Sequence, residues 1–430
     1  MSTGREGTRK FVSDTGWNYG AFALMAGTGI ILNFFIVVVM GVEALGVFNQ
    51  TYAIFVVVGQ LATLGIHDST QKYVAEHGDG EASLRSAITT GAVQAAAFFG
   101  LASALALYFA ADWIGAAFES DAVGISVAFI APGVGLFAFN KTLIGILNGQ
   151  RRMREYALAQ SLRVLVILLF CIGIGVTGGE AAYLGLGFTV AEVVLLPLLL
   201  IFVRPRWRQM DTETFAWIVR HAKFGFKALT NGILAEAYIR IDVIMLGLFL
   251  DDVQVGIYSF AALFVEGLYQ VPAVVRTVAN PVLVGLIKAR DMIATVKFTR
   301  RVFAASFAIY AVAAGACLLI FPMLAPYFPD GLIAGAYPLL FPLLGGLLLY
   351  AGFVPLDYVL LQSGMPGRQS MLMAFNVSIN IVLNAILIPM FGLWGAAIAT
   401  GVSFALVTVT LNVASARWLG FRRGLLLAPR

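Results

Sequence analysis

The chain alternates about twelve long apolar stretches with short connections, and this alternation narrowly limits what it can fold into. Each stretch is roughly 18 to 28 residues long, and a bilayer core of about 30 Å needs roughly 20 apolar residues of helix. Hydrophobic residues make up 60% of the chain and charged residues only 12%, which is outside the range of soluble domains. The sequence therefore predicts an all-α protein that crosses a membrane about twelve times.

The predicted helices follow the limits of the apolar stretches. They span residues 16–42, 47–75, 86–111, 122–148, 156–177, 182–203, 223–249, 255–287, 301–326, 336–362, 370–390 and 393–416. Lys and Arg occupy alternate connections, for example Arg151 with Arg152, whereas the connections between them carry acidic residues such as Glu180 and Asp330. Basic connections mark the cytoplasmic side, so we expect a multi-pass protein of the cell membrane with both termini inside the cell.

The longest polar connection lies near the middle of the chain and divides the helices into two groups of six. A short motif recurs after the first helix of each half, as Gly46-Val47-Phe48 and as Gly256-Ile257-Tyr258. Repeated halves of this kind are typical of transporters. We expect a cytoplasmic N-terminal arm over 1–15, a first six-helix bundle over 16–203, a cytoplasmic linker over 204–222, a second bundle over 223–416 and a cytoplasmic tail over 417–430.

Sequence patterns that carry catalytic chemistry are missing from the chain. Its 3 histidines and 2 cysteines do not have the spacing of a zinc site, and there is no HExxH, GxxxxGK[ST] or GxSxG motif. We therefore expect no catalytic residue, no metal, no cofactor and no ATP hydrolysis by this chain. The net charge of +5 comes from basic residues at helix ends, where anionic lipid headgroups, and not nucleic acid, are the expected partners.

Several segments, spread over most of the chain, resemble those of a known family. In the first half they are Leu45-Gly46-Val47-Phe48, Leu64-Gly65-Ile66 and Lys72-Tyr73-Val74-Ala75. In the second half they are Tyr238-Ile239-Arg240-Ile241-Asp242-Val243-Ile244-Met245-Leu246-Gly247, Val255-Gly256-Ile257-Tyr258, Asn380-Ile381-Val382-Leu383-Asn384, Ile388-Pro389, Phe391-Gly392 and Gly395-Ala396-Ala397-Ile398-Ala399-Thr400. With these segments the chain resembles the polysaccharide transporters, or O-antigen flippase-like oligosaccharide-lipid flippases, of the multidrug/oligosaccharidyl-lipid/polysaccharide exporter superfamily.

The resemblance implies a flippase that moves a polyprenyl-linked oligosaccharide across the cytoplasmic membrane for polysaccharide or glycan biosynthesis, by alternating access between two helical bundles. A helix count nearer 12 than 14 favours this branch over the lipid II flippases. We expect a monomer, surrounded by membrane lipids, that works beside glycan-assembly enzymes. One alternative is a cation-coupled multidrug exporter of the same superfamily, although acidic residues are sparse in the first half. Another is a membrane glycosyltransferase or polymerase, which would need a larger outer loop for catalysis.

Ionisable side chains inside the apolar stretches are the candidate functional residues. A charge in hydrocarbon costs at least a few kcal/mol and normally faces a cavity or a partner. Glu236 and Arg240 lie four residues apart on one helical face, and Asp242 is turned away from Arg240. The other candidates are Glu266 in the second half, Lys141, Arg163 and Glu192 in the first half, and Asp68 and Asp357 nearer the cytoplasmic helix ends.

Two interpretations of these charges stay open. In the first, Arg240, Arg163 and Lys141 bind the pyrophosphate or acidic sugars of the substrate, since a guanidinium group offers two parallel donors to phosphate oxygens. The acidic residues then balance charge or carry a coupling proton or sodium ion; they are Glu236, Asp242, Glu192, Glu266, Asp68 and Asp357. In the second interpretation, Glu236 with Arg240 and Arg163 with Glu192 are fixed ion pairs within the bundle.

Three asparagines recur at intervals of four residues in the stretch 370–390, namely Asn376, Asn380 and Asn384. This spacing places their amides along one face of the predicted helix. They are candidates for hydrogen bonds to sugar hydroxyls, and equally for hydrogen bonds that join neighbouring helices.

Overall fold

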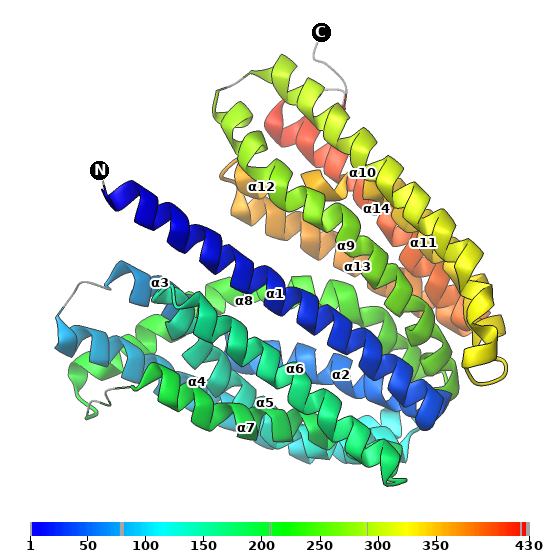
Figure 1. Ribbon diagram of the computed structural model, residues 1–430, viewed down its shortest axis with the longest axis horizontal. Coiled ribbons are helices and arrows are strands. Elements are labelled where there is room, and N and C mark those ends of the chain that lie inside the picture. The colour runs from blue at the N-terminus through cyan, green and yellow to red at the C-terminus, as the bar shows by residue number, and fades with distance from the viewer. Residues whose placement is uncertain are drawn as a thin grey trace. The chain divides into compact units, whose positions relative to one another are not determined.

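The computed structural model describes residues 2–77, 81–205, 207, 209–289, 291–421 and 424–426, without the side chains of 2–15, 230–232, 235, 237–239 and 288. This described part is almost entirely helical and contains no strand, which confirms the predicted all-α class (Figure 1). Eleven of its helices are long and apolar enough to cross a membrane. The remaining predicted span, 223–249, lies within α8 (Thr212–Phe249), whose apolar half carries Glu236, Arg240 and Asp242. The chain is a multi-pass membrane protein.

The residues divide by their internal contacts into two compact units, 1–236 and 237–430. The dividing point lies inside α8, so that one helix contributes to both units. The segment 204–222 was predicted as a linker; its described residues up to Asp211 are irregular, and the segment then enters α8. The arm 1–15 is helical from Ser2 onward as part of α1, and residues 422, 423 and 427–430 of the tail lie outside the description. The bundle limits and the cytoplasmic position of both termini stay predictions.

Over its described residues, the first unit contains seven α-helices besides the beginning of α8. They are α1 (Ser2–Val39), α2 (Val42–Thr63), α3 (Ile66–Glu76), α4 (Ala82–Ala117), α5 (Asp121–Gly149), α6 (Met153–Val176) and α7 (Leu186–Val203), the last preceded by the 3-10 helix η1 (Ala181–Gly185). Glycines let α4 and α5 pack closely, because a Cβ on Gly100 would lie 2.7 Å from the carbonyl oxygen of Gly135. Leu143 and Ile146 of α5 meet Leu195 of α7 in the core.

The prediction of one helix over 47–75 is wrong, because the chain breaks between α2 and α3. Leu64 and Gly65 both have a positive φ, of 44° and 63°, a conformation that ends a helix and that side chains disfavour. Gly65 also packs on α8, where a Cβ would lie 2.6 Å from the carbonyl oxygen of Gly225. The break therefore depends on a residue without a side chain.

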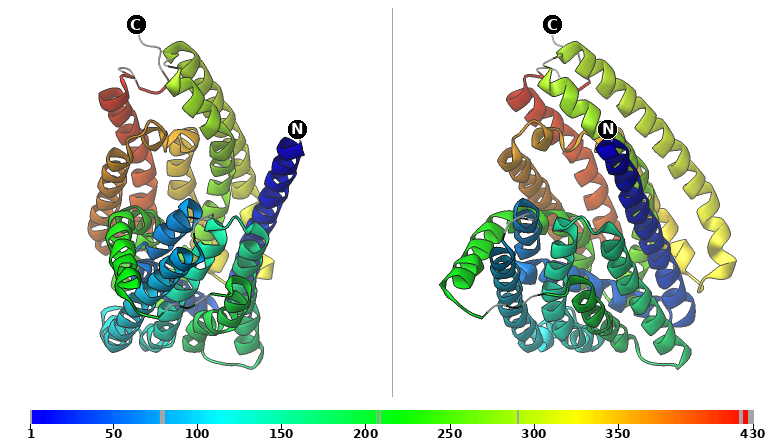
Figure 2. Two further views of the ribbon diagram at one scale, coloured as in Figure 1. Left: turned by 90° about the vertical axis from the view of Figure 1, so that its left-hand side faces the viewer. Right: turned by 60° about the vertical axis from the view of Figure 1, so that its left-hand side comes forward.

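The second unit begins in α8 and continues through long helices that pack side by side (Figure 2). They are α9 (Asp252–Lys288), α10 (Met292–Ile320), α11 (Leu332–Ala351), α13 (Pro366–Phe391) and α14 (Leu393–Leu419), with the short elements η2 (Phe321–Tyr327), η3 (Val354–Leu356) and α12 (Val359–Gln362). The predicted helix 336–362 is interrupted after Ala351. Pro355 in the interruption has no amide hydrogen to continue a helix, and Gly352 adds conformational freedom.

Large apolar side chains cover the outer faces of both units. Phe98, Phe109 and Trp113 project from α4, and Leu319 projects from α10, with 68% to 81% of each side chain exposed. Apolar surface on this scale is stable against lipid tails and not against water. Polar residues inside each unit are exceptions to this apolar pattern, and they are therefore the candidates for a functional site.

Candidate functional site

In the first unit, the predicted residues Arg163 and Glu192 form a buried ion pair between α6 and α7. Arg163 Nε lies 2.6 Å from Glu192 Oε1, and Nη2 lies 3.4 Å from Oε2. The third nitrogen of the guanidinium group, Nη1, donates to Gln160 Oε1 at 2.7 Å. Asn140 of α5 donates to the other carboxylate oxygen, Glu192 Oε2, at 2.8 Å. Only 1% of the Glu192 side chain and 14% of the Arg163 side chain are exposed. The two side chains thus bind each other, which is the contact that the second interpretation predicted.

Lys141, the neighbour of Asn140 on α5, has a different kind of environment. Its Nζ donates to the neutral Gln60 Oε1 of α2 at 2.7 Å and lies 5.1 Å from the centroid of the Phe137 ring. The Arg163 guanidinium lies 5.0 Å from the same ring, which stabilises both cations through its negative faces. Glu236 and Asp68 attract Lys141 electrostatically. Among the described ion pairs of the first unit, none involves Lys141.

Asp68 and Glu236 lie at the edges of this group. Asp68, in the first turn of α3, is half-exposed, and its Oδ1 lies 3.4 Å from Nε2 of the neighbouring His67. Glu236 is the last residue of the first unit and acts on Lys141 through its charge. The structure therefore brings five of the predicted residues into one electrostatic neighbourhood, centred on Lys141.

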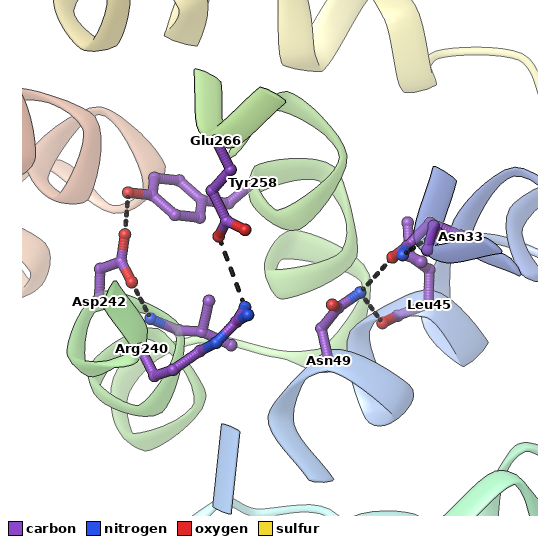
Figure 3. A network of polar contacts seen from close by, with 9 residues as sticks. Asn33, Leu45, Asn49, Arg240, Asp242, Tyr258 and Glu266 are labelled. Atoms are coloured by element: carbon purple, nitrogen blue, oxygen red, sulfur yellow. Dashed lines mark hydrogen bonds and ion pairs between the residues drawn. The ribbon is translucent and has the colours of Figure 1, made fainter. Parts of the chain in front are cut away.

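In the second unit, Arg240 of α8 and Glu266 of α9 point toward each other (Figure 3). Their Nη1 and Oε1 atoms are 3.5 Å apart, and the Glu266 side chain is 41% exposed. The described ion pair of Arg240 is therefore with Glu266, and the pairing with Glu236 that their spacing suggested stays a prediction. The sequence placed Glu266 at a similar depth to Arg240, which this contact requires.

Asp242 of α8 belongs to a second network in this unit, again turned away from Arg240 (Figure 3). Its Oδ2 accepts a hydrogen bond of 2.7 Å from the hydroxyl of Tyr258, a fully buried residue of α9. The same hydroxyl lies 3.2 Å from Thr400 Oγ1 of α14, and Asp242 Oδ1 accepts from the amide of Val243. The network joins three helices through a carboxylate whose direct partners are neutral.

Asp357 lies in the interruption after α11 and is held by several partners. Its Oδ2 lies 2.8 Å from Arg276 Nη1 of α9 and accepts a hydrogen bond of 3.0 Å from the Tyr350 hydroxyl. Gln369 of α13 donates to its backbone carbonyl oxygen. The Arg276 guanidinium also lies 4.7 Å from the centroid of the Tyr358 ring. Asp357 thus fixes the interruption by contacts to α9 and α13.

Two of the three asparagines of α13 connect this helix to α14, and the third bonds within α13. Asn380 Nδ2 donates to Ser403 Oγ of α14 at 3.1 Å, and Asn376 Oδ1 accepts from Thr410 Oγ1 of α14 at 2.9 Å. Asn384 Nδ2 donates to the backbone and side-chain oxygens of Asn380. The contacts of Asn376 and Asn380 are those of the interhelical alternative, whereas Asn384 bonds within α13 and its buried Oδ1 accepts no described hydrogen bond.

Comparison with known proteins places the chain in a family. The family described as polysaccharide biosynthesis protein matches residues 11–287. The chain belongs to this family. It is 24% identical over 314 residues to a lipid III flippase of Escherichia coli (strain K12), a match that covers 68% of this chain and 73% of that protein. It is 25% identical over 412 residues to the probable flippase AglR of Haloferax volcanii, covering 91% and 80%.

Solved structures share the fold of this family member at low sequence identity. The lipid II flippase MurJ, in an inward closed conformation, superimposes with a TM-score of 0.76 at 13% identity, over 94% of this chain and 87% of that chain. An inward-facing multidrug resistance MATE family transporter of the MOP superfamily gives 0.72 at 14% identity, over 92% and 95%. The predicted exporter-superfamily fold is therefore confirmed.

The neutral partners of the charged residues were not predicted from the sequence, because the candidates there were chosen by their charge. Gln60, Asn140 and Gln160 complete the contacts around Lys141 and Arg163, and Tyr258 completes those of Asp242. The signal that identifies them is an amide or hydroxyl group within an apolar stretch, where it needs a partner on another helix. Gln60, Asn140 and Gln160 lie in the first unit, and Tyr258 lies in the second.

Proposed function

We propose that this protein is a flippase, without a catalytic centre, that moves a polyprenyl-linked oligosaccharide across the cell membrane by alternating access. Its family membership, the two relatives named as flippases and the fold shared with a lipid flippase support this function. The observation that carries the proposal is Lys141, a cation inside an apolar helical unit whose described direct contacts are a neutral amide and an aromatic ring. A buried cation without a carboxylate in contact is suited to an anionic substrate group.

In this proposal, Lys141 binds the diphosphate that links the lipid to the sugar, and Arg163 does not. The donors of Arg163 already contact Glu192 and Gln160, so a phosphate would have to displace a buried carboxylate. Lys141 would at most give up its charged hydrogen bond to Gln60, which costs about 2 kcal/mol. An ammonium group also carries three donors, so it can hold Gln60 and a phosphate oxygen together.

The other predicted residues take supporting roles. Arg240 is proposed as a second substrate contact, because its partner Glu266 is 41% exposed and the 3.5 Å ion pair is long. Asp242 is proposed to carry the coupling proton or sodium ion, since its direct partners are neutral. Glu192, Glu236, Asp68 and Asp357 would balance charge, Asn376 and Asn380 would hold α13 to α14, and Asn384 would orient Asn380.

The test is translocation in liposomes, in the absence of ATP, of a radiolabelled polyprenyl diphosphate that carries an oligosaccharide. Transfer is scored as the label that becomes accessible to a glycosidase on the opposite side. We expect wild-type protein to transfer the lipid, and Lys141→Gln to lower transfer at least tenfold while it folds normally. Arg368→Gln, a matched loss of one exposed cation on α13, should transfer at the wild-type rate.

The alternative function is favoured by the likeness to a multidrug transporter fold. The same liposomes, loaded with a fluorescent organic cation and given a proton or sodium gradient, separate the two functions. Absence of lipid transfer together with gradient-driven efflux of the dye would reject the flippase. Lipid transfer that Lys141→Gln leaves unchanged would reject the role proposed for Lys141.

A further inference from the structure

One side of α2, in the first unit, carries a row of side chains that leads away from Lys141. The row begins at Gln60, whose Oε1 accepts the hydrogen bond from Lys141. Toward the start of the helix it continues through Val56, Tyr52 and Asn49. Residues three and four positions apart lie on the same face of a helix. Gln60 is buried, whereas the other three residues of the row are partly exposed. An accessible face of α2 thus extends from the proposed phosphate contact.

At the far end of this row, Asn49 pairs with Asn33 of α1 (Figure 3). Asn49 Nδ2 donates to Asn33 Oδ1 at 3.1 Å and to the carbonyl oxygen of Leu45 at 3.0 Å. Asn33 Nδ2 donates to the carbonyl oxygen of Gly29 at 2.8 Å. These bonds use both amide hydrogens of Asn49 and one of the two on Asn33. Among the described residues, Asn49 Oδ1 has no donor and the other hydrogen of Asn33 has no acceptor. The pair therefore offers one acceptor and one donor, which together match a hydroxyl group.

Tyr52, the next residue of the row, has its ring oriented by two buried phenylalanines. The ring is parallel to that of Phe188 of α7, with 4° between the planes and 5.6 Å between the centroids. Phe48 of α2 stacks on the same Phe188 ring at 5.5 Å, and its centroid lies 6.3 Å from that of Tyr52. Phe48 and Phe188 belong to the core, whereas the Tyr52 side chain stays partly exposed. A ring that the core already orients loses little freedom when a ligand stacks on it.

The depth of these residues in the membrane favours a polar surrounding over lipid tails. Tyr52 lies in the middle of α2, whereas tyrosines that anchor a helix in the headgroups lie near its ends. Asn33 and Asn49 are equally far in sequence from Gly41, where α1 turns into α2, and their helical rise places both roughly 12 Å from this turn. An amide exposed to hydrocarbon at that depth would keep unsatisfied hydrogen-bonding groups, at a cost of several kcal/mol. A path for a polar substrate satisfies them.

We propose that Tyr52, Asn33 and Asn49 form a subsite for one sugar ring of the lipid-linked oligosaccharide. The C–H groups on one side of a sugar ring carry a slight positive charge and pack on the negative face of an aromatic ring, and the sugar hydroxyls bond to amides. Tyr52 and Asn49 lie roughly 12 and 16 Å along α2 from Gln60. With the diphosphate on Lys141, the subsite therefore takes a sugar beyond the one joined to the diphosphate. The inference rests on the proposed function and adds the position of the glycan to it.

The experiment measures the Kd of the full-length protein for two lipids, a polyprenyl diphosphate that carries an oligosaccharide and the same lipid without sugar. We expect wild type to bind the sugar-bearing lipid about tenfold more tightly, as a stacked ring and one or two hydrogen bonds provide. Tyr52→Leu and Asn49→Leu should bring the two Kd values together by weakening only the sugar-bearing lipid. Tyr52→Phe keeps the ring and should keep most of the preference. Lys141→Gln should weaken both lipids. Tyr108→Leu, which removes an exposed tyrosine from α4, should bind both like wild type.

The outcomes distinguish the subsite from the proposed function. Equal Kd values in wild type, or a full preference for the sugar-bearing lipid in Tyr52→Leu, would overturn the subsite and leave the flippase standing. If Tyr52→Leu weakened both lipids to the same extent, or if Tyr108→Leu lost the preference as well, the ring would have a structural role only and the subsite would again be overturned. If wild type bound neither lipid, the flippase function would fail and the subsite with it. The comparison of Tyr52→Leu with Tyr52→Phe decides even where Asn49→Leu does not fold.

Discussion

Replacing Arg163 with alanine should strongly destabilise the first unit. The substitution leaves Glu192, of which 1% is exposed, as a carboxylate without a cation in contact, held by the amide of Asn140 alone. Removing one partner of a buried ion pair costs about 3–5 kcal/mol, because the remaining charge stays buried. Lys141→Ala provides the comparison, since it leaves the neutral Gln60 without its charged donor, at a cost of about 2 kcal/mol.

A double-mutant cycle isolates the interaction from the loss of side-chain packing. Glu192→Gln removes the charge that Arg163 neutralises, so Arg163→Ala combined with Glu192→Gln should cost less than the two single changes added together. The expected coupling is about 2–3 kcal/mol, near the upper end for groups in contact. The free energy of unfolding is measured in mixed micelles titrated with dodecyl sulfate, by tryptophan fluorescence. Additive costs, or an Arg163→Ala cost no larger than that of Lys141→Ala, would refute the reasoning.

Three further changes test other contacts. Gly401→Ala should lower the melting temperature by several degrees, because its Cβ would overlap a carbonyl oxygen of α11, whereas Gly345→Ala, with open space around it, should not. Burial lowers the pKa of His221, which precedes the predicted span in α8, to about 4. As the pH falls, the unfolded chain therefore binds the proton before the folded protein does. The stability present above about pH 6.5 should decrease toward pH 4, and His221→Gln should remove this dependence. Tyr258→Phe should cost about 1–3 kcal/mol in the dodecyl sulfate titration, because Asp242 loses its donor, and an unchanged midpoint would contradict that contact.

The positions of most helices follow from the sequence because a membrane imposes one length and one polarity on every span. The prediction 122–148 corresponds to α5, Asp121–Gly149, and 393–416 corresponds to α14, Leu393–Leu419. The breaks were harder to predict. Apolar residues continue across the interruption after Ala351. At Leu64 and Gly65 the chain passes from the apolar α2 to the more polar α3, and the turn there depends on the close packing of Gly65 on α8.

The charged residues show where sequence reasoning ends. Helical spacing says which side chains share a face, and this placed Glu236 near Arg240 and Asp242 away from it. It does not say which helix lies opposite, so the contact of Arg240 with Glu266, 26 residues later, depends on how α8 and α9 pack. The pair of Arg163 and Glu192 was open to both interpretations for the same reason; its contacts on α5, α6 and α7 support the second, and its part in transport stays a prediction.

The fold alone does not choose between a lipid and a drug as substrate, because a lipid flippase and a multidrug transporter both share it. Charged side chains whose described hydrogen-bond partners are neutral are more informative. Lys141 in the first unit and Asp242 in the second are two of them, since they contact Gln60 and Tyr258. A cation with a neutral partner is suited to bind an anionic substrate group, and a carboxylate with a neutral partner is suited to bind a coupling cation. Under the proposed function, Lys141→Gln should therefore weaken substrate affinity at every pH, whereas Asp242→Asn should change only the dependence of transport on the ion gradient.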